Sequence, residues 1–318
     1  MADITGNFAD NFDDDLQLAV KTYQHNFNLN PTGELDMPTL TQIVRPRCGV
    51  ADIMNGTSSM NSDWSPAADR LHAVAHFSFF PGAPRWRASK THLTYAFLPE
   101  NHLTDSVKAV FARAFSRWSE VIPMNFTETA SFTRADIQVG FFAGDHADGA
   151  PFDGSLGTLA HAFSPPSGMF HLDGDENWVV DGEFGAGSSV VSAVDLESVA
   201  IHEIGHLLGL GHSSVEEAIM FPTLPAATRK VKLADDDIRG IQALYGSNPN
   251  YNGSSTSTTH ERETSGRASH IGTPLLGMGF LLTVGSLTLT FYYFFFCGDK
   301  FGKITKLYKG LSFFSLHF

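Results

Sequence analysis

Three histidines and a glutamate lie close together in the segment AIHEIGHLLGLGHSS, residues 200–214. On a helix, His202 and His206 are one turn apart on the same face, so both imidazoles can reach one metal ion. Gly209 permits a bend in the backbone, after which His212 can return as a third ligand. Three protein ligands leave one position open for water, which is typical of a catalytic zinc site.

Glu203 lies beside these ligands and can reach a water bound to the metal. Zinc lowers the pKa of such a water from about 15.7 to about 7. We expect Glu203 to accept its proton as hydroxide attacks a peptide carbonyl, and then to deliver a proton to the leaving amine. The alternative is a buried helix with incidental histidines, which the added glycine and third histidine disfavour.

The run HEIGHLLGLGHS, followed by AIMFP, resembles the HExxHxxGxxH motif and Met-turn of the metzincins. The serine after the third histidine resembles the matrix metalloproteinases, or matrixins, in particular. The resemblance implies an α/β (α+β) catalytic domain with a twisted, mostly parallel sheet and three helices. It also implies a metalloendopeptidase, and it places Met220 in the turn beneath the zinc.

The segment PRCGVAD, residues 46–52, looks like the cysteine switch of the matrixins. A thiolate is a good zinc ligand, so Cys48 could occupy the open position and keep the zymogen silent. In the family, Arg47 and Asp52 pair and hold the switch loop in shape. The alternative is a free cysteine in a loop.

A further group of metal-ligating residues lies between these two motifs. His146, Asp148, His161 and His171 could give four nitrogen or oxygen ligands with no open position, as a structural zinc requires. Taken singly, each is as well explained as a solvated loop residue. The resemblance assigns them the structural zinc.

Three more carboxylates, those of Asp153, Asp173 and Glu176, are spread among glycines in the same region. Hard oxygen ligands on a tight loop suit calcium. The resemblance assigns them a calcium site and adds three backbone carbonyls, those of Gly154, Leu156 and Thr158. A second calcium site of the family lacks its expected aspartate here, and Asp136 is the remaining candidate.

By resemblance, the strand that contains GTLAHAF forms the upper rim of a substrate cleft. Leu159 and Ala160 would offer backbone groups to an extended peptide, which would be added as a strand. Pro222 to Leu224 would wall the pocket for the residue after the scissile bond, and we expect that pocket to be apolar.

The segment LADDDIRGIQALYG, residues 233–246, resembles the last helix of the catalytic domain. Asp236 or Asp237 is implied to receive the new N-terminal ammonium after activation. Ordinary acidic residues at a helix N-terminus are the alternative for each.

Hydrophobic periodicity and capping residues predict the elements that must position these groups. The expected elements are a helix with Phe12, Leu16, Ala19, Val20 and Tyr23 on one face, a second helix over 37–44 capped by Asp36, strands over 92–98 and 135–142, and a helix over 105–121 capped by Thr104.

The composition of the 318 residues limits the remaining function classes. The net charge of −13 argues against a nucleic-acid partner, since phosphate backbones attract basic surfaces. The two cysteines, Cys48 and Cys297, lie in dissimilar segments, so we expect no disulfide framework. We expect a monomer whose partners are protein or peptide substrates and an activating protease.

The chain divides into unequal parts, and the activation cleavage is expected between Met60 and Phe77. No segment resembles a hemopexin-like domain, as in the plant-type matrixins. The expected parts are a helical propeptide over 1–76, shortened at its N-terminus, a zinc metalloprotease domain over 77–247, a flexible linker over 248–270, an apolar segment over 271–297 that is long enough to cross a bilayer, and a basic tail over 298–318.

The place of action follows less directly from the sequence. The start, MADITGNFADNFDDD, lacks the basic and apolar regions of a secretory signal. The resemblance nevertheless implies action in the extracellular matrix or at the outer face of the plasma membrane. Residues 271–297 could be a single span, a GPI signal or a tail with no cellular role, and these alternatives stay open.

Two functions remain. One is a zinc- and calcium-dependent endopeptidase, made as a zymogen, that cuts extracellular-matrix or cell-surface proteins. The other is a catalytically silent, truncated product that acts only as a metal-binding or interaction module. The intact Glu203 and its three neighbouring histidines favour the endopeptidase.

Overall fold

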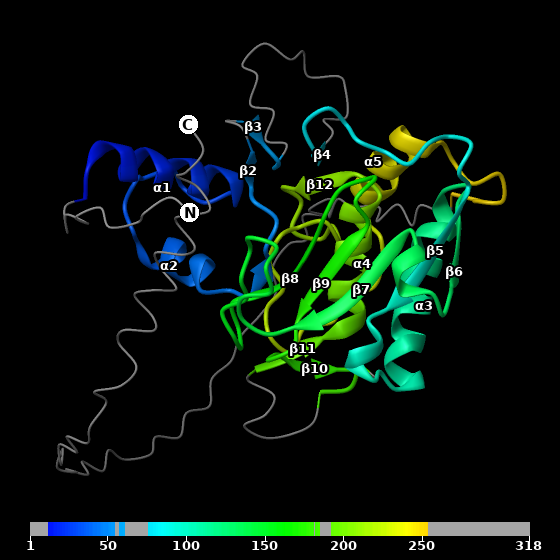
Figure 1. Ribbon diagram of the computed structural model, residues 1–318. Coiled ribbons are helices and arrows are strands. Elements are labelled where there is room, and N and C mark those ends of the chain that lie inside the picture. The colour runs from blue at the N-terminus through cyan, green and yellow to red at the C-terminus, as the bar shows by residue number, and fades with distance from the viewer. Residues whose placement is uncertain (1–11, 55–56, 61–75, 181, 185–191, 254–318) are drawn as a thin grey trace, which may run out of the picture.

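The computed structural model describes residues 12–54, 57–60, 76–180, 182–184 and 192–253. A small helical part at the N-terminus lies beside a larger α/β part, seen at the left and right of Figure 1. The expected α/β (α+β) architecture, with a mostly parallel sheet and three helices after residue 77, is confirmed.

One six-stranded sheet forms the frame of the α/β part, in the order β1-β8-β9-β7-β5-β6. Neighbouring strands are parallel except for β8 and β9, which are antiparallel. The edge beyond β8 is therefore closed by β1, a strand from the distant N-terminal segment. The strand bounds are Arg47–Cys48 (β1), His92–Phe97 (β5), Asn125–Glu128 (β6), Ile137–Phe142 (β7), Thr158–Ala162 (β8) and Met169–Asp173 (β9).

Three helices pack with this sheet: α3 (Asp105–Val121), α4 (Leu196–Leu207) and α5 (Asp235–Tyr245). The predicted cap of α3 is confirmed, because the Thr104 hydroxyl accepts the first-turn N–H of Val107. The indole of Trp118 on α3 donates to the carbonyl of Ile201 on α4 at 2.9 Å. Side chains of all three helices and of the sheet form one continuous core, which holds α4 rigidly in place.

Short strands and turns complete the α/β part. Their bounds are Ile53–Met54 (β2), Thr57–Ser58 (β3), Phe77–Phe79 (β4), Asn177–Val179 (β10), Ala193–Asp195 (β11) and Leu210–Ser213 (β12), with 3₁₀ turns at Pro99–Asn101 and Phe132–Arg134. Strand β12 pairs antiparallel with β4, beside α5. This pairing fixes the chain directly after α4.

The N-terminal part consists of α1 (Asp14–Asn26) and α2 (Met37–Ile43). Asp36 caps α2 as predicted, with its carboxylate 3.0 Å from the amide of Thr39. The expectation that Phe12 lies on the buried face was wrong. Its side chain is 48% exposed, because the helix begins at Asp14 and Phe12 precedes the cap.

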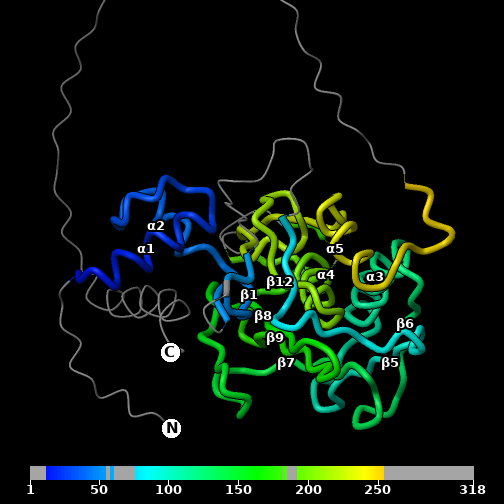
Figure 2. Tube along the Cα trace, turned by 90° about the horizontal axis from the view of Figure 1, so that it is seen from above, coloured from blue at the N-terminus to red at the C-terminus, as the bar shows by residue number. Residues whose placement is uncertain are grey.

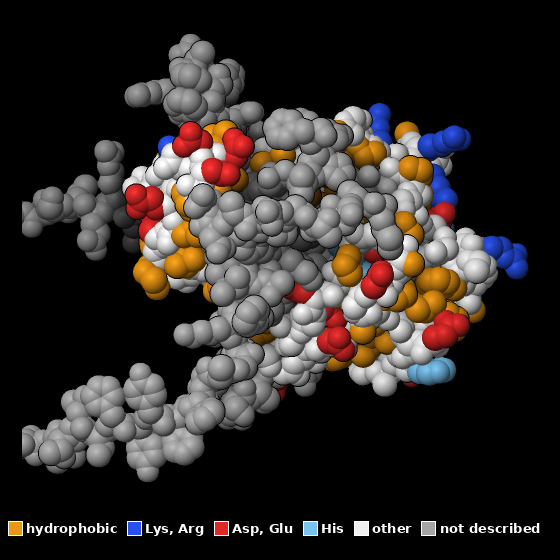
Figure 3. All heavy atoms as spheres, turned by 60° about the vertical axis from the view of Figure 1, so that its left-hand side comes forward, with side chains coloured by type: hydrophobic (Ala, Val, Ile, Leu, Met, Phe, Trp, Pro, Cys, Tyr) orange, Lys and Arg blue, Asp and Glu red, His pale blue; other side chains and the backbone are white. Residues whose placement is uncertain are grey.

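The helical part contacts the α/β part through a small apolar cluster of Tyr23, Phe27 and Phe221. Figure 2 shows α1 and α2 to one side, with β1 placed against β8 at the boundary. On the face shown in Figure 3, hydrophobic side chains of this region lie among acidic ones. Large apolar side chains that remain exposed on the helical part are Phe12, Leu18, Met37 and Val44.

Within the described ranges, no helix combines the length and the apolar character needed to span a bilayer. The apolar segment 271–297 and the basic tail 298–318 lie outside the described residues.

Candidate metal centre

The buried helix α4 and the strand that follows it bring three histidines together. Asp195 caps the helix by accepting the amide of Ser198 at 2.8 Å. His202 and His206 lie one turn apart, as predicted. Gly209 adopts φ +105°, a conformation that a β-carbon would make costly, and β12 then returns His212 to the same point.

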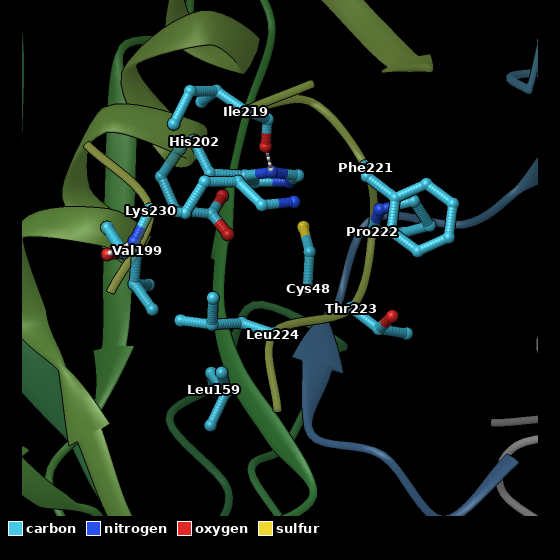
Figure 4. A pocket seen from close by; sticks show the side chains of 12 residues that line it. Cys48, Leu159, Val199, His202, Ile219, Phe221, Pro222, Thr223, Leu224 and Lys230 are labelled. Carbon is cyan, nitrogen blue, oxygen red and sulfur yellow. Dashed lines mark hydrogen bonds between the residues drawn. The ribbon is translucent and has the colours of Figure 1, made fainter. Parts of the chain in front are cut away.

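The side chains of these three histidines converge with that of Cys48. The Nε2 atoms of His202 and His206 are 3.1 Å apart, and the Cys48 sulfur lies 3.4 Å from His206 Nε2. All four possible ligand atoms lie within 4.8 Å of one another, and all four residues are buried. In Figure 4 the sulfur of Cys48 points from β1 toward the His202 ring.

The outer nitrogens show that the inner ones are available to a metal. Nδ1 of His202 lies 2.7 Å from the carbonyl of Ile219, and Nδ1 of His206 lies 2.8 Å from the carbonyl of Leu210. Because a carbonyl only accepts, each Nδ1 must carry the proton and each Nε2 a lone pair.

His212 follows the same pattern with a different partner. Its Nδ1 lies 2.9 Å from the carboxylate of Asp52, and its Nε2 is buried without a hydrogen-bond partner. Three histidine nitrogens with lone pairs and the Cys48 sulfur thus face one point, and none of these groups carries a positive charge. This arrangement fits a bound cation, and the nitrogen–sulfur donor set suits zinc.

Burial changes the protonation of the whole centre. It lowers the pKa of His202 to about 3 and holds the pKa values of His206 and His212 below their ordinary value, which favours the neutral form that binds metals. Burial also raises the pKa of Glu203 to about 8, although the neighbouring Cys48 thiol lowers it in part. Both Glu203 carboxylate oxygens are buried without a regular hydrogen bond.

The main chain around Cys48 lies between the two segments expected to bind substrate. The amide of Gly49 donates to the carbonyl of Ala160 at 2.7 Å, beside Leu159 on β8. On the other side, the Cys48 amide donates to the carbonyl of Pro222 at 2.9 Å, and the Leu224 amide donates to that of Pro46 at 3.0 Å. The backbone groups of the two expected substrate-binding segments are thus hydrogen-bonded to the chain's own N-terminal segment.

A small cavity lies next to Glu203, with the side chains drawn in Figure 4 around it. Leu159, Val199, Ile219 and Leu224 give it the apolar character expected from the sequence. Lys230 also lines it, and its ammonium donates to two backbone carbonyls of the turn at residues 216–218. No motif in the sequence predicted this cation beside the cavity.

Met220, which the resemblance assigns to the Met-turn, packs against the ligand-bearing helix. Its sulfur packs so closely on Gly205 of α4 that a β-carbon there would collide with it. Asp237 accepts the backbone amides of Ile219 and Met220, at 2.8 Å and 3.0 Å, and so fixes this turn.

Asp236 faces a different part of the chain. Its carboxylate accepts the backbone amide of His76 at 3.0 Å and the hydroxyl of Ser213 at 2.8 Å. Of the two aspartates that the sequence left as alternatives, Asp236 is the one beside the main chain that precedes Phe77.

The second predicted group also forms a cluster. One carboxylate oxygen of Asp148 lies 2.8 Å from His146 Nε2, 2.7 Å from His161 Nε2 and 2.8 Å from His171 Nδ1. His161 and His171 are partners across the antiparallel β8–β9 pair. Burial lowers the pKa of His161 to about 4, which favours a neutral ligand. Four donors around one point fit a second cation.

The predicted calcium residues lie nearby and leave two oxygens without partners. Asp173 Oδ2 and Glu176 Oε2 are buried with no hydrogen bond. Burial, with a contribution from Asp173 and Asp153, raises the pKa of Glu176 to about 7. The amides of Thr158 and Leu156 donate to Asp153 and Glu176, at 2.8 Å each. These carboxylates are not among the tight ligand groups found in the described residues.

Asp136 is otherwise engaged. Its carboxylate pairs with Lys90 and accepts the amide of Thr94 at 2.9 Å. These bonds leave Asp136 poorly placed to serve the additional calcium site for which the sequence made it a candidate.

The fold and this arrangement of histidines define a metallopeptidase of the metzincin type, with α4 as its ligand-bearing helix. A matrixin family profile matches residues 85–246, and a profile described as a peptidoglycan binding domain matches residues 3–43. The second match coincides with the helical N-terminal part.

Several relatives are similar to this chain over most of its own length. Metalloendoproteinase 2-MMP of Arabidopsis thaliana is 59% identical over 271 residues, which cover 82% of this chain and 72% of the relative. Metalloendoproteinase 1 of Glycine max is 52% identical, covering 76% and 77%. Interstitial collagenase of Oryctolagus cuniculus is 39% identical, covering 73% of this chain and 43% of the collagenase. The chain belongs to the matrixin family and is a metalloendopeptidase.

Proposed function

We propose that this chain is the zymogen of a zinc-dependent endopeptidase, silenced by Cys48. The observation that carries the proposal is the convergence of the Cys48 sulfur with three neutral histidines beside an unpartnered carboxylate, that of Glu203. His202, His206 and His212 would hold the catalytic zinc, and Cys48 would be its fourth ligand until the segment is removed.

A bound zinc ion supplies Lewis-acid chemistry, which makes water acidic and polarises a carbonyl. Glu203 lies beside the centre in the same cavity as Cys48, where a carboxylate could take up a proton from water and return it. Glu203 would accept the proton of the attacking water and deliver it to the leaving amine. The packing of Met220 on Gly205 would hold α4, and with it His202 and His206, in a fixed position.

Removal of the Cys48 segment would free the cleft for substrate. An extended peptide could then use the backbone of Leu159 and Ala160 on one side and of Pro222 to Leu224 on the other, as the N-terminal segment does in the latent chain. The apolar cavity beside Glu203 would take an aliphatic side chain after the scissile bond. We propose extracellular-matrix or cell-surface proteins as substrates, in keeping with the name of the collagenase relative.

Two further cations would serve the fold. His146, Asp148, His161 and His171 would hold a structural zinc, because they offer four donors and no open position. Asp153, Asp173 and Glu176 would bind calcium, and the two orphaned oxygens support this. The carbonyls proposed to complete the calcium shell are those of Gly154, Leu156 and Thr158.

The division of the chain belongs to the same proposal. Residues 1–76 would be the propeptide, 77–247 the catalytic domain, 248–270 a linker, 271–297 an apolar anchor or signal, and 298–318 a basic tail. An activating protease would cut between Met60 and Phe77, and Asp236 would then receive the new ammonium group. The mature enzyme would act as a monomer in the extracellular matrix or at the outer face of the plasma membrane.

Cleavage of casein by the full-length, zinc-loaded chain tests this proposal. The wild-type chain should be silent, and Cys48→Ala should cleave without any processing, because the fourth ligand is gone. Adding Glu203→Ala to Cys48→Ala should lower the rate by about 10²–10⁴-fold. Zinc content, measured by atomic absorption, should stay the same in all three proteins.

Three results would contradict the proposal. A Cys48→Ala chain that binds zinc but cleaves nothing would favour the silent metal-binding module. Equal cleavage with and without Glu203 would remove that residue from the proton-transfer role. Cleavage by the untreated wild-type chain would reject Cys48 as the lock.

A further inference from the structure

The three histidines of the metal centre differ in what their outer nitrogens contact. His202 and His206 point theirs at backbone carbonyls within the α/β part. His212 instead has the carboxylate of Asp52 at 2.9 Å. Asp52 belongs to the same N-terminal segment as Cys48, so this outer partner would leave the centre when that segment is removed.

The contact between Asp52 and His212 is fully enclosed. Both residues have 0% exposed surface. The second carboxylate oxygen of Asp52 is held by the Arg47 guanidinium at 2.8 Å, which supplies a counter-charge. A buried carboxylate with two directional partners has little freedom to turn away, so it holds the His212 ring in one orientation.

The surrounding main chain keeps the two residues in register. The Ser59 amide donates to the carbonyl of Asp52 at 2.6 Å, and Met60 forms a parallel bridge with His212. The Ser78 hydroxyl lies 2.9 Å from the His212 carbonyl. Asp52, Ser59 and Met60 are thus fastened to one another and to the strand that carries the third histidine.

We propose that Asp52 is a positioning residue for the metal centre, which makes His212 a stronger ligand for as long as the N-terminal segment is attached. The latent chain would therefore retain its metal more tightly than the cleaved enzyme, for a reason separate from the Cys48 thiolate. This inference rests on the proposed function in taking zinc as the metal.

The physical reason lies in the charge of the outer partner. A carboxylate that accepts the outer N–H of a ligating histidine fixes the ring and raises the basicity of the inner nitrogen. Loss of such a partner lowers metal affinity by about 10–100-fold. A backbone carbonyl carries no net charge, so the outer partners of His202 and His206 give their rings less of this support.

Zinc release from the full-length chain to a chromophoric chelator tests the role of Asp52. Asp52→Asn keeps an oxygen that can accept from His212 but removes the charge, and we expect the affinity for zinc to fall by about 10–100-fold. Arg47→Gln is the matched control, because it breaks the ion pair and leaves the Asp52–His212 bond. It should change zinc affinity much less.

Two further measurements keep the test decisive if Asp52→Asn folds poorly with an unpaired guanidinium. The double variant Arg47→Gln/Asp52→Asn removes both buried charges together and should release zinc as Asp52→Asn does. In a Cys48→Ala chain, cutting off the N-terminal segment removes Asp52 with no change at the sulfur position, and zinc release should accelerate by about the same 10–100-fold.

Unchanged zinc release in the double variant and after cleavage of Cys48→Ala would overturn the inference. Equal effects of Arg47→Gln and Asp52→Asn would do so as well, because Asp52 would then act through the ion pair alone. A wild-type chain that binds no zinc at all would contradict the proposed function instead, so the two failures are distinguishable.

Discussion

Asp148 and Cys48 complete the two histidine groups of this protein from very different distances along the chain. Asp148 lies 13 residues from His161 and 23 from His171, within one continuous region of loops and strands. Cys48 lies 158 residues from His206, on the edge strand β1 of the sheet. Asp148 therefore comes from the same region as its histidines, whereas Cys48 is brought to its histidines by β1, a strand of the N-terminal segment.

This difference indicates what each group can do. A centre whose four donors all come from the same folded region leaves no position for water, which is the arrangement of a structural zinc site. In the proposed zymogen, removal of the N-terminal segment would open the centre that Cys48 completes, and the buried Glu203 lies beside it. The burial of the two centres also differs: all four residues of the Cys48 centre are buried, whereas in the Asp148 centre only His161 is buried and the other three residues are partly exposed.

Replacing Asp148 and Cys48 in turn, and comparing the loss of stability, is the strongest test of the difference between the two centres. Asp148→Ala should remove one zinc per chain and destabilise the fold by about 4 kcal/mol, the value for a ligand present at a thousand times its dissociation constant. Differential scanning calorimetry should record a fall of about 8–16 °C. Cys48→Ala is the matched variant and should lower the melting temperature less, since three histidines and the core remain. A larger loss for Cys48→Ala would reverse the assignment of roles.

Calcium sharpens the same comparison within the second region. Calcium saturation should raise the melting temperature, because the free oxygens of Asp173 and Glu176 gain a partner. A stabilisation of about 2.7 kcal/mol is expected at a hundred times the dissociation constant. Glu176→Gln should abolish the calcium-dependent increment, and Glu100→Gln at an exposed turn should keep it. A full increment in Glu176→Gln would remove that residue from the site.

The smallest expected effect concerns the tight packing of α4 against Met220. In Gly205→Ala the new methyl group would collide with the Met220 sulfur and lie 3.1 Å from the Trp118 ring. We expect a loss of about 1–2 kcal/mol in the free energy of unfolding, because the methionine can shift only in part. Urea denaturation measures it. Wild-type stability for Gly205→Ala would show that the helix is held less rigidly than the contacts imply.

Local patterns predicted the elements that carry the chemistry. The spacing of His202 and His206 corresponds to one helical turn. Thr104 and Asp36 mark where helices begin, because their side chains cap the first turn. Such signals involve residues a few positions apart, so they can be read without knowing the fold. The prediction for Phe12 failed because periodicity alone does not say where a helix begins.

Longer-range contacts left no signal of this kind. Lys230 beside the cavity and Asp236 beside His76 depend on loops that meet only in the folded chain. The sequence had left Asp236 and Asp237 as alternatives, because two adjacent acidic residues on one helix turn are equivalent until their neighbours are known.

The sequence by itself determined the ligand-bearing helix, the bend at Gly209 and the family, because each depends on residue types at fixed short spacing. Only the tertiary structure decided that β1 closes the edge of the sheet and that Asp52 meets His212 across 160 residues. The reason is physical: a sheet edge and a buried hydrogen bond select their partners by shape and polarity in space, which the order of residues along the chain does not record.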